Sequence, residues 1–286
     1  MSDTAPFDYS VVIPAHNEGA VIDRCLQSML AGGGNGEIVV VCNGCTDDTA
    51  ERAKRISDRI TVVDLAVGSK PIALNEGDRV ATAFPRFYID ADVEVSPGAL
   101  ADVARTMAER RLDAAAPRIR FDVRTSTLPA RLYYGIWARS PYFGDGLIGA
   151  GFYGLSRGAR ARFDEWPDIY ADDMYILTIT RPEERGTATG ATFTPLMPRS
   201  VRELVKVQKR HYAAKHQFHE YLQNSPRSVV YATPSGDRRW LRRVARDVRS
   251  WPGLALFVTV NLYGVAAGKK QTSAGRMTWH QDRSTR

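Results

Sequence analysis

The sequence lacks the features that mark a secreted, disulfide-stabilised or membrane-spanning chain. Residues 1–8 are polar without a basic stretch, and the apolar run that follows them is too short for a secretory signal. Only three of the 286 residues are cysteine, which does not suggest a disulfide scaffold. The apolar stretch at residues 254–267 is shorter than the roughly 20 residues that a membrane span requires, and Asn261 and Gly264 interrupt it. These absences predict a cytoplasmic protein without a transmembrane helix.

Positive charge is in excess. The formal net charge is +7, and the isoelectric point is near 9.4. Such a balance indicates an anionic partner, for which a membrane surface, a nucleotide and a nucleic acid are the candidates. The length of 286 residues suits one large α/β domain, or a domain of ordinary size with an extension.

Apolar strands and amphipathic helices alternate through the first hundred residues. Strands are expected at residues 9–13, 38–41, 60–65 and 87–89, and a helix follows each of them. Four successive βα units predict a parallel sheet. Pro71 fits the first turn of the third helix, so Lys70 projects from a helix N-terminus, a favourable place to meet phosphate.

Two carboxylates follow the fourth strand. Asp90 and Asp92 flank Ala91, and because side chains alternate along an extended segment, both carboxylates can point the same way. Ligands of open α/β sheets bind at this end of the strands. Oxygen ligands that leave coordination sites open suit Mg²⁺ or Mn²⁺, which complete their shells with water and phosphate oxygens. The pair therefore predicts a divalent cation bound to a diphosphate.

Two further motifs each allow more than one functional interpretation. Cys42 and Cys45 follow the second strand and precede a helix, which fits either a thioredoxin-like redox pair or a turn with two semi-buried thiols. Gly149, Gly151 and Gly154 have the spacing of a dinucleotide fingerprint. That fingerprint needs a strand before it and a helix opening within it, whereas a loop precedes this one, so no nicotinamide or flavin site is expected.

The motifs of the first half occur in the order seen in glycosyltransferase family 2. They are Pro14-Ala15-His16-Asn17-Glu18, the turn that starts at Asn43, Lys70 with the Ala-Leu-Asn of residues 73–75, and Asp90-Ala91-Asp92. Together they span residues 9–95, and the sequence resembles the inverting enzymes of that family. The resemblance implies an α/β fold of the GT-A type, a Rossmann-like, mostly parallel sheet flanked by helices.

The resemblance also implies a donor site. Its nucleotide-binding residues would be Pro14, Ala15, His16, Asn17, Glu18, Asn43, Lys70, Asp90 and Ala91, and Asp92 with Asp90 would hold Mn²⁺ or Mg²⁺. The family commonly has an aspartate where Asn43 stands. Whether the donor is a UDP-sugar or a GDP-sugar therefore stays open.

The second half adds catalytic candidates. Asp172 and Asp173 are similar to the family's acidic pair, so Asp173 is expected to be the general base and Asp172 to orient the acceptor; acids at a helix N-terminus are the alternative. The family's small-residue strand lining the donor and acceptor sites is matched by Gly149, Ala150, Gly151 and Phe152. Residues 208–212 resemble the Gln-x-x-Arg-Trp motif of processive members. Because His211 and Tyr212 stand in its Arg-Trp places, processivity is not predicted, and Arg210 or His211 is expected to neutralise the leaving diphosphate.

The C-terminal region has its own pattern. Along residues 237–251, apolar side chains that include Trp240 and Trp251 share one helical face, and six arginines share the other. This pattern is typical of a helix in a membrane interface, and packing on the catalytic domain or on a second subunit of a homodimer is the alternative. We expect a GT-A nucleotide-sugar transferase domain at residues 1–225, and a basic amphipathic helical extension with a flexible tail at residues 226–286.

The expected function is metal-dependent, inverting transfer of a hexosyl or N-acetylhexosaminyl group from a nucleotide-diphosphate sugar to a sugar or lipid-linked acceptor. Cell-envelope glycan, glycolipid or polysaccharide synthesis, at the inner face of the cell membrane, is the expected setting. One alternative is a sugar-1-phosphate nucleotidyltransferase, although residues 14–17 stand where its glycine-rich loop belongs. Another is a non-catalytic protein that binds membrane or nucleic acid. Nucleic acid is not expected, because the arginines form one helix face without a base-stacking platform.

Overall fold

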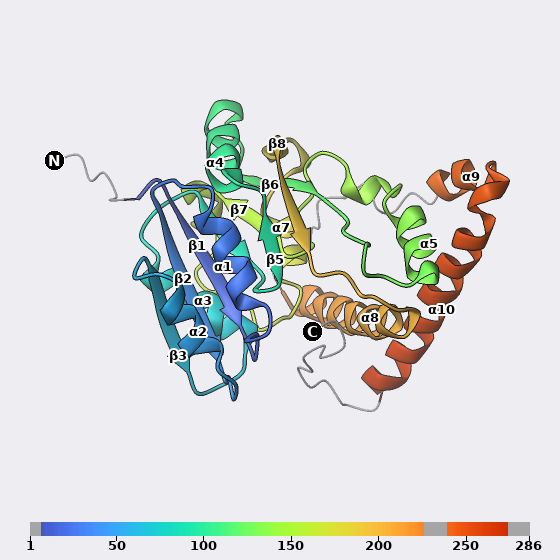
Figure 1. Ribbon diagram of the computed structural model, residues 1–286, viewed down its shortest axis with the longest axis horizontal. Coiled ribbons are helices and arrows are strands. Elements are labelled where there is room, and N and C mark those ends of the chain that lie inside the picture. Colours follow the sequence, from blue (N-terminus) through green and yellow to red (C-terminus); the bar gives the residue numbers. More distant parts are fainter. Residues whose placement is uncertain (1–6, 226–238, 274–286) are drawn as a thin grey trace. The chain divides into compact units, whose positions relative to one another are not determined.

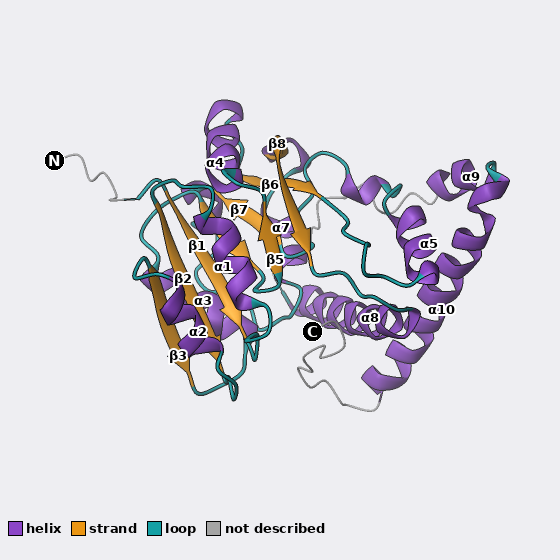
Figure 2. Ribbon diagram, in the orientation of Figure 1, coloured by secondary structure: helices purple, strands orange, loops and turns teal. Residues whose placement is uncertain are grey.

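The computed structural model describes residues 7–225 and 239–273, which form two compact units. The first unit comprises Met1–Arg120 and Asp145–Pro195, and the second comprises Phe121–Gly144 and Leu196–Arg286. All strands in the described ranges belong to the first unit, whereas the described part of the second unit is built from helices (Figure 2).

The first unit is built on an eight-stranded sheet (Figure 1). The strands are β1 (Tyr9–Ala15), β2 (Gly36–Asn43), β3 (Ile60–Leu65), β4 (Arg86–Ile89), β5 (Val93–Val95), β6 (Ala114–Ile119), β7 (Phe152–Leu155) and β8 (Arg185–Pro195). Their order across the sheet is β3-β2-β1-β4-β7-β6-β8-β5. β1 to β4 pair in parallel, and β7 lies antiparallel between β4 and β6. The carboxyl ends of the four parallel strands therefore meet at one edge.

Helices flank this sheet. They are α1 (Ile22–Leu30), α2 (Thr49–Ile56), α3 (Lys70–Val80), α4 (Ala99–Arg110), the short α6 (Arg157–Arg160), α7 (Asp172–Ile179) and the 3₁₀ turn η2 (Pro182–Glu184). A helix follows each of the first three strands as predicted, whereas the short strand β5 stands between β4 and α4. α3 packs against β1 and β2. The approach is close because Gly77 lies over Val12, where an added Cβ would come within 2.3 Å of the valine side chain. α3 is consequently fixed over the buried centre of the sheet.

The second unit contains α5 (Leu128–Trp137), η1 (Pro141–Phe143), α8 (Val201–Asn224), α9 (Arg239–Ala245), η4 (Val248–Ser250) and α10 (Trp251–Ser273). Its core joins Tyr133 and Tyr134 of α5, Leu204 of α8 and Val260 of α10. Ser200 and Glu203 form a capping box at the start of α8.

α8 belongs to the second unit, whereas we had assigned it to the catalytic domain by a boundary near residue 225. The difference has a physical cause, because α8 buries Leu204 in the core of the second unit and packs along α10. The capping box shows where the helix begins but carries no signal for what it packs against. Residues 226–238 and 274–286, which include the predicted tail, lie outside the described residues.

The helices near the C-terminus also differ from expectation. The single helix expected over residues 237–251 is divided, since α9 ends at Ala245 and the Asp247 carboxylate accepts a hydrogen bond from the Arg249 amide at the start of η4. In the described residues, one helical stretch, Val248–Lys269, is long and apolar enough to cross a membrane by length and composition. Asn261 does not interrupt it, because its side chain donates to the Phe257 carbonyl one turn earlier.

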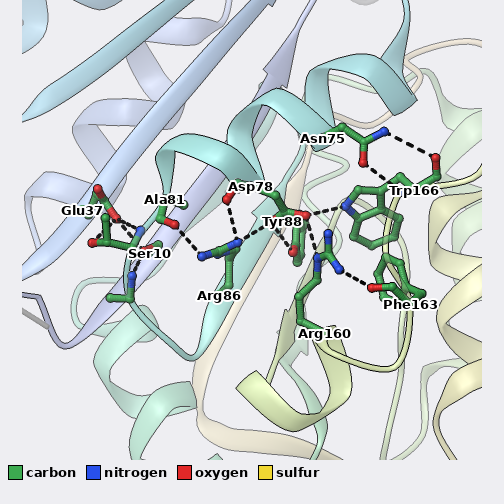
Figure 3. Close-up of polar contacts among 12 residues, drawn as sticks. Ser10, Glu37, Asn75, Asp78, Ala81, Arg86, Tyr88, Arg160, Phe163 and Trp166 are labelled. Carbon is green, nitrogen blue, oxygen red and sulfur yellow. Dashed lines mark hydrogen bonds and ion pairs between the residues drawn. The ribbon is translucent and has the colours of Figure 1, made fainter. Parts of the chain in front are cut away.

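A buried carboxylate joins several elements of the first unit (Figure 3). The Asp78 side chain, on α3, is 6% exposed. It accepts hydrogen bonds from Arg86 (2.7 Å) and Tyr88 (2.7 Å) of β4, from Arg160 of α6 (2.7 Å) and from the Trp166 indole (2.8 Å). Two arginines therefore share one carboxylate in a site with little water.

Asp78→Asn is expected to lower the free energy of unfolding by about 3–5 kcal/mol, because it leaves two buried guanidinium groups without their anion. Urea denaturation followed by circular dichroism measures the loss. Asp58→Asn, at an exposed aspartate after α2, is the matched control and should change stability by less than about 0.5 kcal/mol. Equal effects of the two substitutions would show that the Asp78 cluster does not stabilise the unit.

Candidate active site

The segments after β1 and β2 are held together by hydrogen bonds at the carboxyl ends of the strands. The Asn43 side chain is 2% exposed and donates to the Ala15 carbonyl at 2.8 Å. His16 Nδ1 lies 2.6 Å from the Asn43 carbonyl oxygen, and the Thr46 amide donates to the Asn17 side chain at 2.7 Å. The predicted nucleotide-binding segments thus form one framework, in which the Asn43 amide nitrogen bonds to protein.

The loop after β1 is completed by the start of α2. The Glu18 amide donates to the Thr49 hydroxyl at 2.8 Å, and the Asn17 backbone takes a positive φ of 54°. Cys45 accepts a hydrogen bond from the Asn17 amide, and Cys42 is buried within β2. Reactive cysteines need an accessible thiol. The structure therefore favours the turn with two semi-buried thiols over the redox pair.

The Lys70 ammonium joins two of the predicted acids. It projects from the first turn of α3 and donates to Asp90 Oδ1 and to Asp172 Oδ1, both at 2.9 Å. The two carboxylates raise the pKa of Lys70 against the opposing effect of burial. A permanently charged lysine thereby brings the ends of β4 and α7 together.

Asp172 has a second partner that sequence reasoning missed. The Tyr153 hydroxyl donates to Asp172 Oδ2 at 2.6 Å, and the aspartate is 6% exposed. We had assigned Phe152, the preceding residue, to the donor and acceptor site. The structure places the Phe152 side chain in the core, with ring centroids 5.7 Å from Phe87 and 5.6 Å from Phe193. Successive strand residues face opposite ways, and Tyr153 is the one directed at the acids.

The other predicted residues of that segment form a tight turn. Gly149, Ala150 and Gly151 have φ values of 126°, 58° and 89°. The Gly151 carbonyl accepts from the Asp90 amide at 2.9 Å, and an added Cβ on Gly151 would lie 3.1 Å from Asp90 Oδ2. β7 follows this turn and no helix opens within it, in agreement with the rejection of a dinucleotide fingerprint.

Asp173 has the electrostatics of a proton acceptor. It lies in the first turn of α7, where burial and the neighbouring charge of Asp172 raise its pKa to about 7, although the Lys70 ammonium opposes the rise. A carboxylate with a pKa near neutrality can take up a proton at physiological pH. Asp172, by contrast, is held in place by Lys70 and Tyr153.

The residues present fit a divalent cation of the magnesium or manganese type. Asp90 and Asp92 supply hard oxygen ligands on either side of the buried Ala91, and the nearby Asp172 and Asp173 add negative charge. Among the described residues no group of three or more His, Cys, Asp or Glu side chains is arranged to hold a metal ion. Water and substrate oxygens would therefore complete the coordination shell. Asp90 and Asp92 are the candidate ligands, with Asp92 the principal one as the resemblance implies, and one oxygen of Asp90 is bound to Lys70.

Arg210 and His211 lie elsewhere in the chain, on α8 of the second unit, and both side chains are exposed. Their predicted contact with the donor diphosphate stays a prediction. Pro14, Ala15, Asn17 and Glu18 surround the end of β1 as expected, although Ala15 is fully buried and offers only its backbone.

A family model matches the part of the chain that carries most of these residues. The sequence model of a family described as Glycosyl transferase family 2 matches residues 10–156. The uncharacterized glycosyltransferase YibD of Escherichia coli K12 is 34% identical over 92 residues, which are 31% of this chain and 27% of YibD. The chain thus matches about a quarter of the length of this relative.

Two solved structures have a similar fold. The mannosyltransferase PcManGT of Pyrobaculum calidifontis, in complex with GDP-Man and Mn²⁺, has a TM-score of 0.56 at 19% identity, over 96% of this chain and 79% of that one. Residues 1–349 of S. aureus TarS in complex with UDP have a TM-score of 0.50 at 13% identity, over 97% and 95% of the two chains. These likenesses confirm the expected GT-A type of α/β fold.

Asp173→Asn is expected to stabilise the protein above pH 7 by about 2–4 kcal/mol. An acid whose folded pKa is raised from 3.8 to about 7 favours folding while protonated, and this stability is lost as the pH rises through that window. The amide removes the charge and keeps the acceptor for the Met174 amide.

Urea unfolding above pH 7 and near pH 4 measures the difference, which should vanish at the lower pH. Asp164→Asn, at an exposed aspartate, is the control and should have no pH-dependent effect. A variant less stable than the wild type at both pH values would contradict a buried, disfavoured charge at Asp173.

Proposed function

Because the chain belongs to glycosyltransferase family 2, we propose that it is an inverting, metal-dependent enzyme. It moves a hexosyl or N-acetylhexosaminyl group from a UDP- or GDP-sugar to an acceptor hydroxyl. The observation that carries the proposal is the Lys70 ammonium, 2.9 Å from both Asp90 and Asp172, because it joins the predicted diphosphate end of the site to the predicted catalytic acids.

The donor binds along the carboxyl ends of β1, β2 and β4. The framework of residues 14–18 and Asn43 receives the nucleoside, and Asp92, assisted by Asp90, holds Mn²⁺ or Mg²⁺ beside the diphosphate. When bound, the cation neutralises charge on the departing nucleoside diphosphate. Support comes from the similar folds of PcManGT, solved with GDP-Man and Mn²⁺, and of TarS, solved with UDP.

The acceptor is activated at Asp173. Its carboxylate takes the proton of the acceptor hydroxyl while the acceptor oxygen attacks the anomeric carbon on the side opposite the phosphate. The bond between that carbon and the phosphate oxygen breaks, and the configuration inverts. Asp172 is a positioning residue, since Lys70 and Tyr153 fix both of its oxygens. A pKa near 7 lets Asp173 be deprotonated before the reaction and protonated after it.

We assign the acceptor to the sugar and lipid-linked glycans of the cell envelope, with polysaccharide and glycolipid synthesis as the setting. The support is the basic second unit, whose charge suits an anionic lipid surface. The transferred sugar would be identified by the nucleotide-sugar donor that the protein binds.

Calorimetric titration with UDP and with GDP, each with and without Mn²⁺, tests the donor site. One nucleotide should bind in a metal-dependent manner, and Asp92→Asn should weaken that binding about tenfold or more, because it removes an anionic ligand of the cation. Asp64→Asn, at an exposed aspartate on β3, is the control and should bind as the wild type. Metal-independent binding that Asp92→Asn leaves unchanged would remove Asp92 from the metal site.

Asp173→Asn should retain nucleotide binding and lose about 10²- to 10⁴-fold in the rate of sugar transfer. In the wild type, kcat/KM should fall as the pH drops below about 7, because protonated Asp173 cannot accept the acceptor's proton. Release of nucleoside diphosphate from donor sugars and acceptor mixtures measures both effects. A variant with wild-type kcat, or release of pyrophosphate from a nucleoside triphosphate instead, would contradict the assignment; the second result would favour a nucleotidyltransferase.

A further inference from the structure

Charge is divided unequally between the two units. The segments of the second unit contain 21 lysines and arginines against six acids, a formal charge of +15. The segments of the first unit contain 18 against 26, a formal charge of −8. The basic excess of the whole chain therefore comes entirely from the second unit, outside the sheet that carries the candidate active site.

α10 of that unit is apolar on both of its faces. Its inner face is buried against α5 and α8, with glycines at the contacts: an added Cβ on Gly264 would lie 2.4 Å from Gln208, and one on Gly268 would lie 2.7 Å from Tyr212. Its outer face exposes Trp251 (58%), Val258 (40%), Leu262 (67%), Tyr263 (61%) and Val265 (40%). No charged residue occurs from Ser250 to Gly268.

The apolar outer face is bounded by positive charge. Arg242, Arg243, Arg246 and Arg249 precede α10 and are exposed, and Lys269 follows the uncharged stretch. The Trp251 indole donates to the Ala245 carbonyl at 2.9 Å, which sets the first exposed aromatic residue of α10 beside the end of arginine-rich α9. Exposed apolar side chains that are flanked by arginine and accompanied by aromatic residues suit a bilayer interface.

We propose that the second unit binds the surface of an anionic lipid bilayer through the outer face of α10 and the arginines of α9 and η4. The apolar side chains enter the boundary between headgroups and acyl chains, and the arginines contact lipid phosphates. This inference concerns a surface separate from the glycosyltransferase site and does not depend on the proposed reaction.

α10 lies in the plane of the interface and does not cross the bilayer. The 22 residues of Val248–Lys269 satisfy the length for a span, but the helix is packed along its inner face against α8. α8 exposes Arg202, Lys206 and Arg210, which the hydrocarbon core would strongly disfavour. Dimerisation through this face is also disfavoured, because it would bring two second units, each with a formal charge of +15, into contact.

Flotation of the full-length protein with phosphatidylcholine vesicles, with and without phosphatidylglycerol, tests the proposal. Binding is expected only with the anionic lipid, and it should weaken with salt. The double variant Arg242→Gln/Arg243→Gln should lower the partition coefficient about 25-fold, because each arginine contributes a factor of about five. Lys54→Gln with Arg55→Gln, two exposed cations on α2, is the matched control and should have no effect.

The apolar contact has its own test. Leu262→Ser should lower the partition coefficient about tenfold, whereas Leu262→Ile, which keeps the apolar area, should not. Brominated lipids should quench tryptophan fluorescence in the wild type, and Trp251→Phe should remove most of that quenching. Circular dichroism confirms that each variant is folded.

Several outcomes would overturn the proposal. These are an absence of binding to anionic vesicles, equal binding of all variants, and retention on membranes after alkaline carbonate extraction, which indicates a span. A concentration-dependent dimer that Leu262→Ser dissociates would identify a second copy as the occupant. Binding to RNA that Leu262→Ser leaves unchanged, without binding to vesicles, would identify nucleic acid as the partner of the arginines.

Discussion

One ammonium group holds the candidate site together. Lys70 shares its proton donors between Asp90 and Asp172, which come from segments 82 residues apart in the chain. Without a cation the two carboxylates would repel each other and separate, since like charges in a partly buried site are strongly disfavoured. Near the other end of α3, Asp78 accepts hydrogen bonds from Tyr88 of β4 and from the indole of Trp166, which precedes α7 in the chain. Both ends of α3 therefore join β4, or the residue after it, to the segment of residues 166–172 that leads into α7.

In this arrangement the charged form of Asp173 is disfavoured. Lys70 and Tyr153 bind the two carboxylate oxygens of Asp172, whereas burial, together with the neighbouring charge of Asp172, raises the pKa of Asp173. A site that keeps a carboxylate poised near neutrality does so at a cost in folding free energy, a trade-off that is common where activity requires it. The Asp78 cluster joins α3, β4 and α6, and it fixes these elements because losing one partner would leave a buried charge unpaired.

The sequence contained enough information for the sheet edge and for most of the site. Apolar alternation and helix-start signals located the first four strands and the helices after the first three of them, and because parallel strands end at one edge, the segments that carry Lys70 and Asp90 could be expected at the same edge. The acidic pair could be assigned to a helix N-terminus. The prediction of which β7 side chain faces the acids was wrong. The turn with positive φ at Ala150 interrupts the alternation of side chains before β7, so nothing in the sequence shows that Tyr153, and not Phe152, faces Asp172.

Other features depend on tertiary contacts that leave no local signal. Asp78 looks like any polar residue near the end of an amphipathic helix, and only the fold shows that two arginines converge on it. Gly264 reads as an interruption of an apolar segment, yet it is the point where α10 approaches Gln208 of α8 most closely. Residue patterns therefore predict where elements begin, but not which neighbour they pack against.

The separation of charge between the units fits the different tasks that we propose for them. A unit of net negative charge that binds a diphosphate, as we propose for the first unit, would have to neutralise it locally, and Lys70 with the proposed cation at Asp92 would provide that positive charge at the edge of the sheet. The second unit contains no comparable acidic site in its described residues, and its cations surround an apolar helix face. The concentration of these cations in one helical unit fits attraction to an extended anionic surface, for which the number and spread of cations matter more than the position of any one.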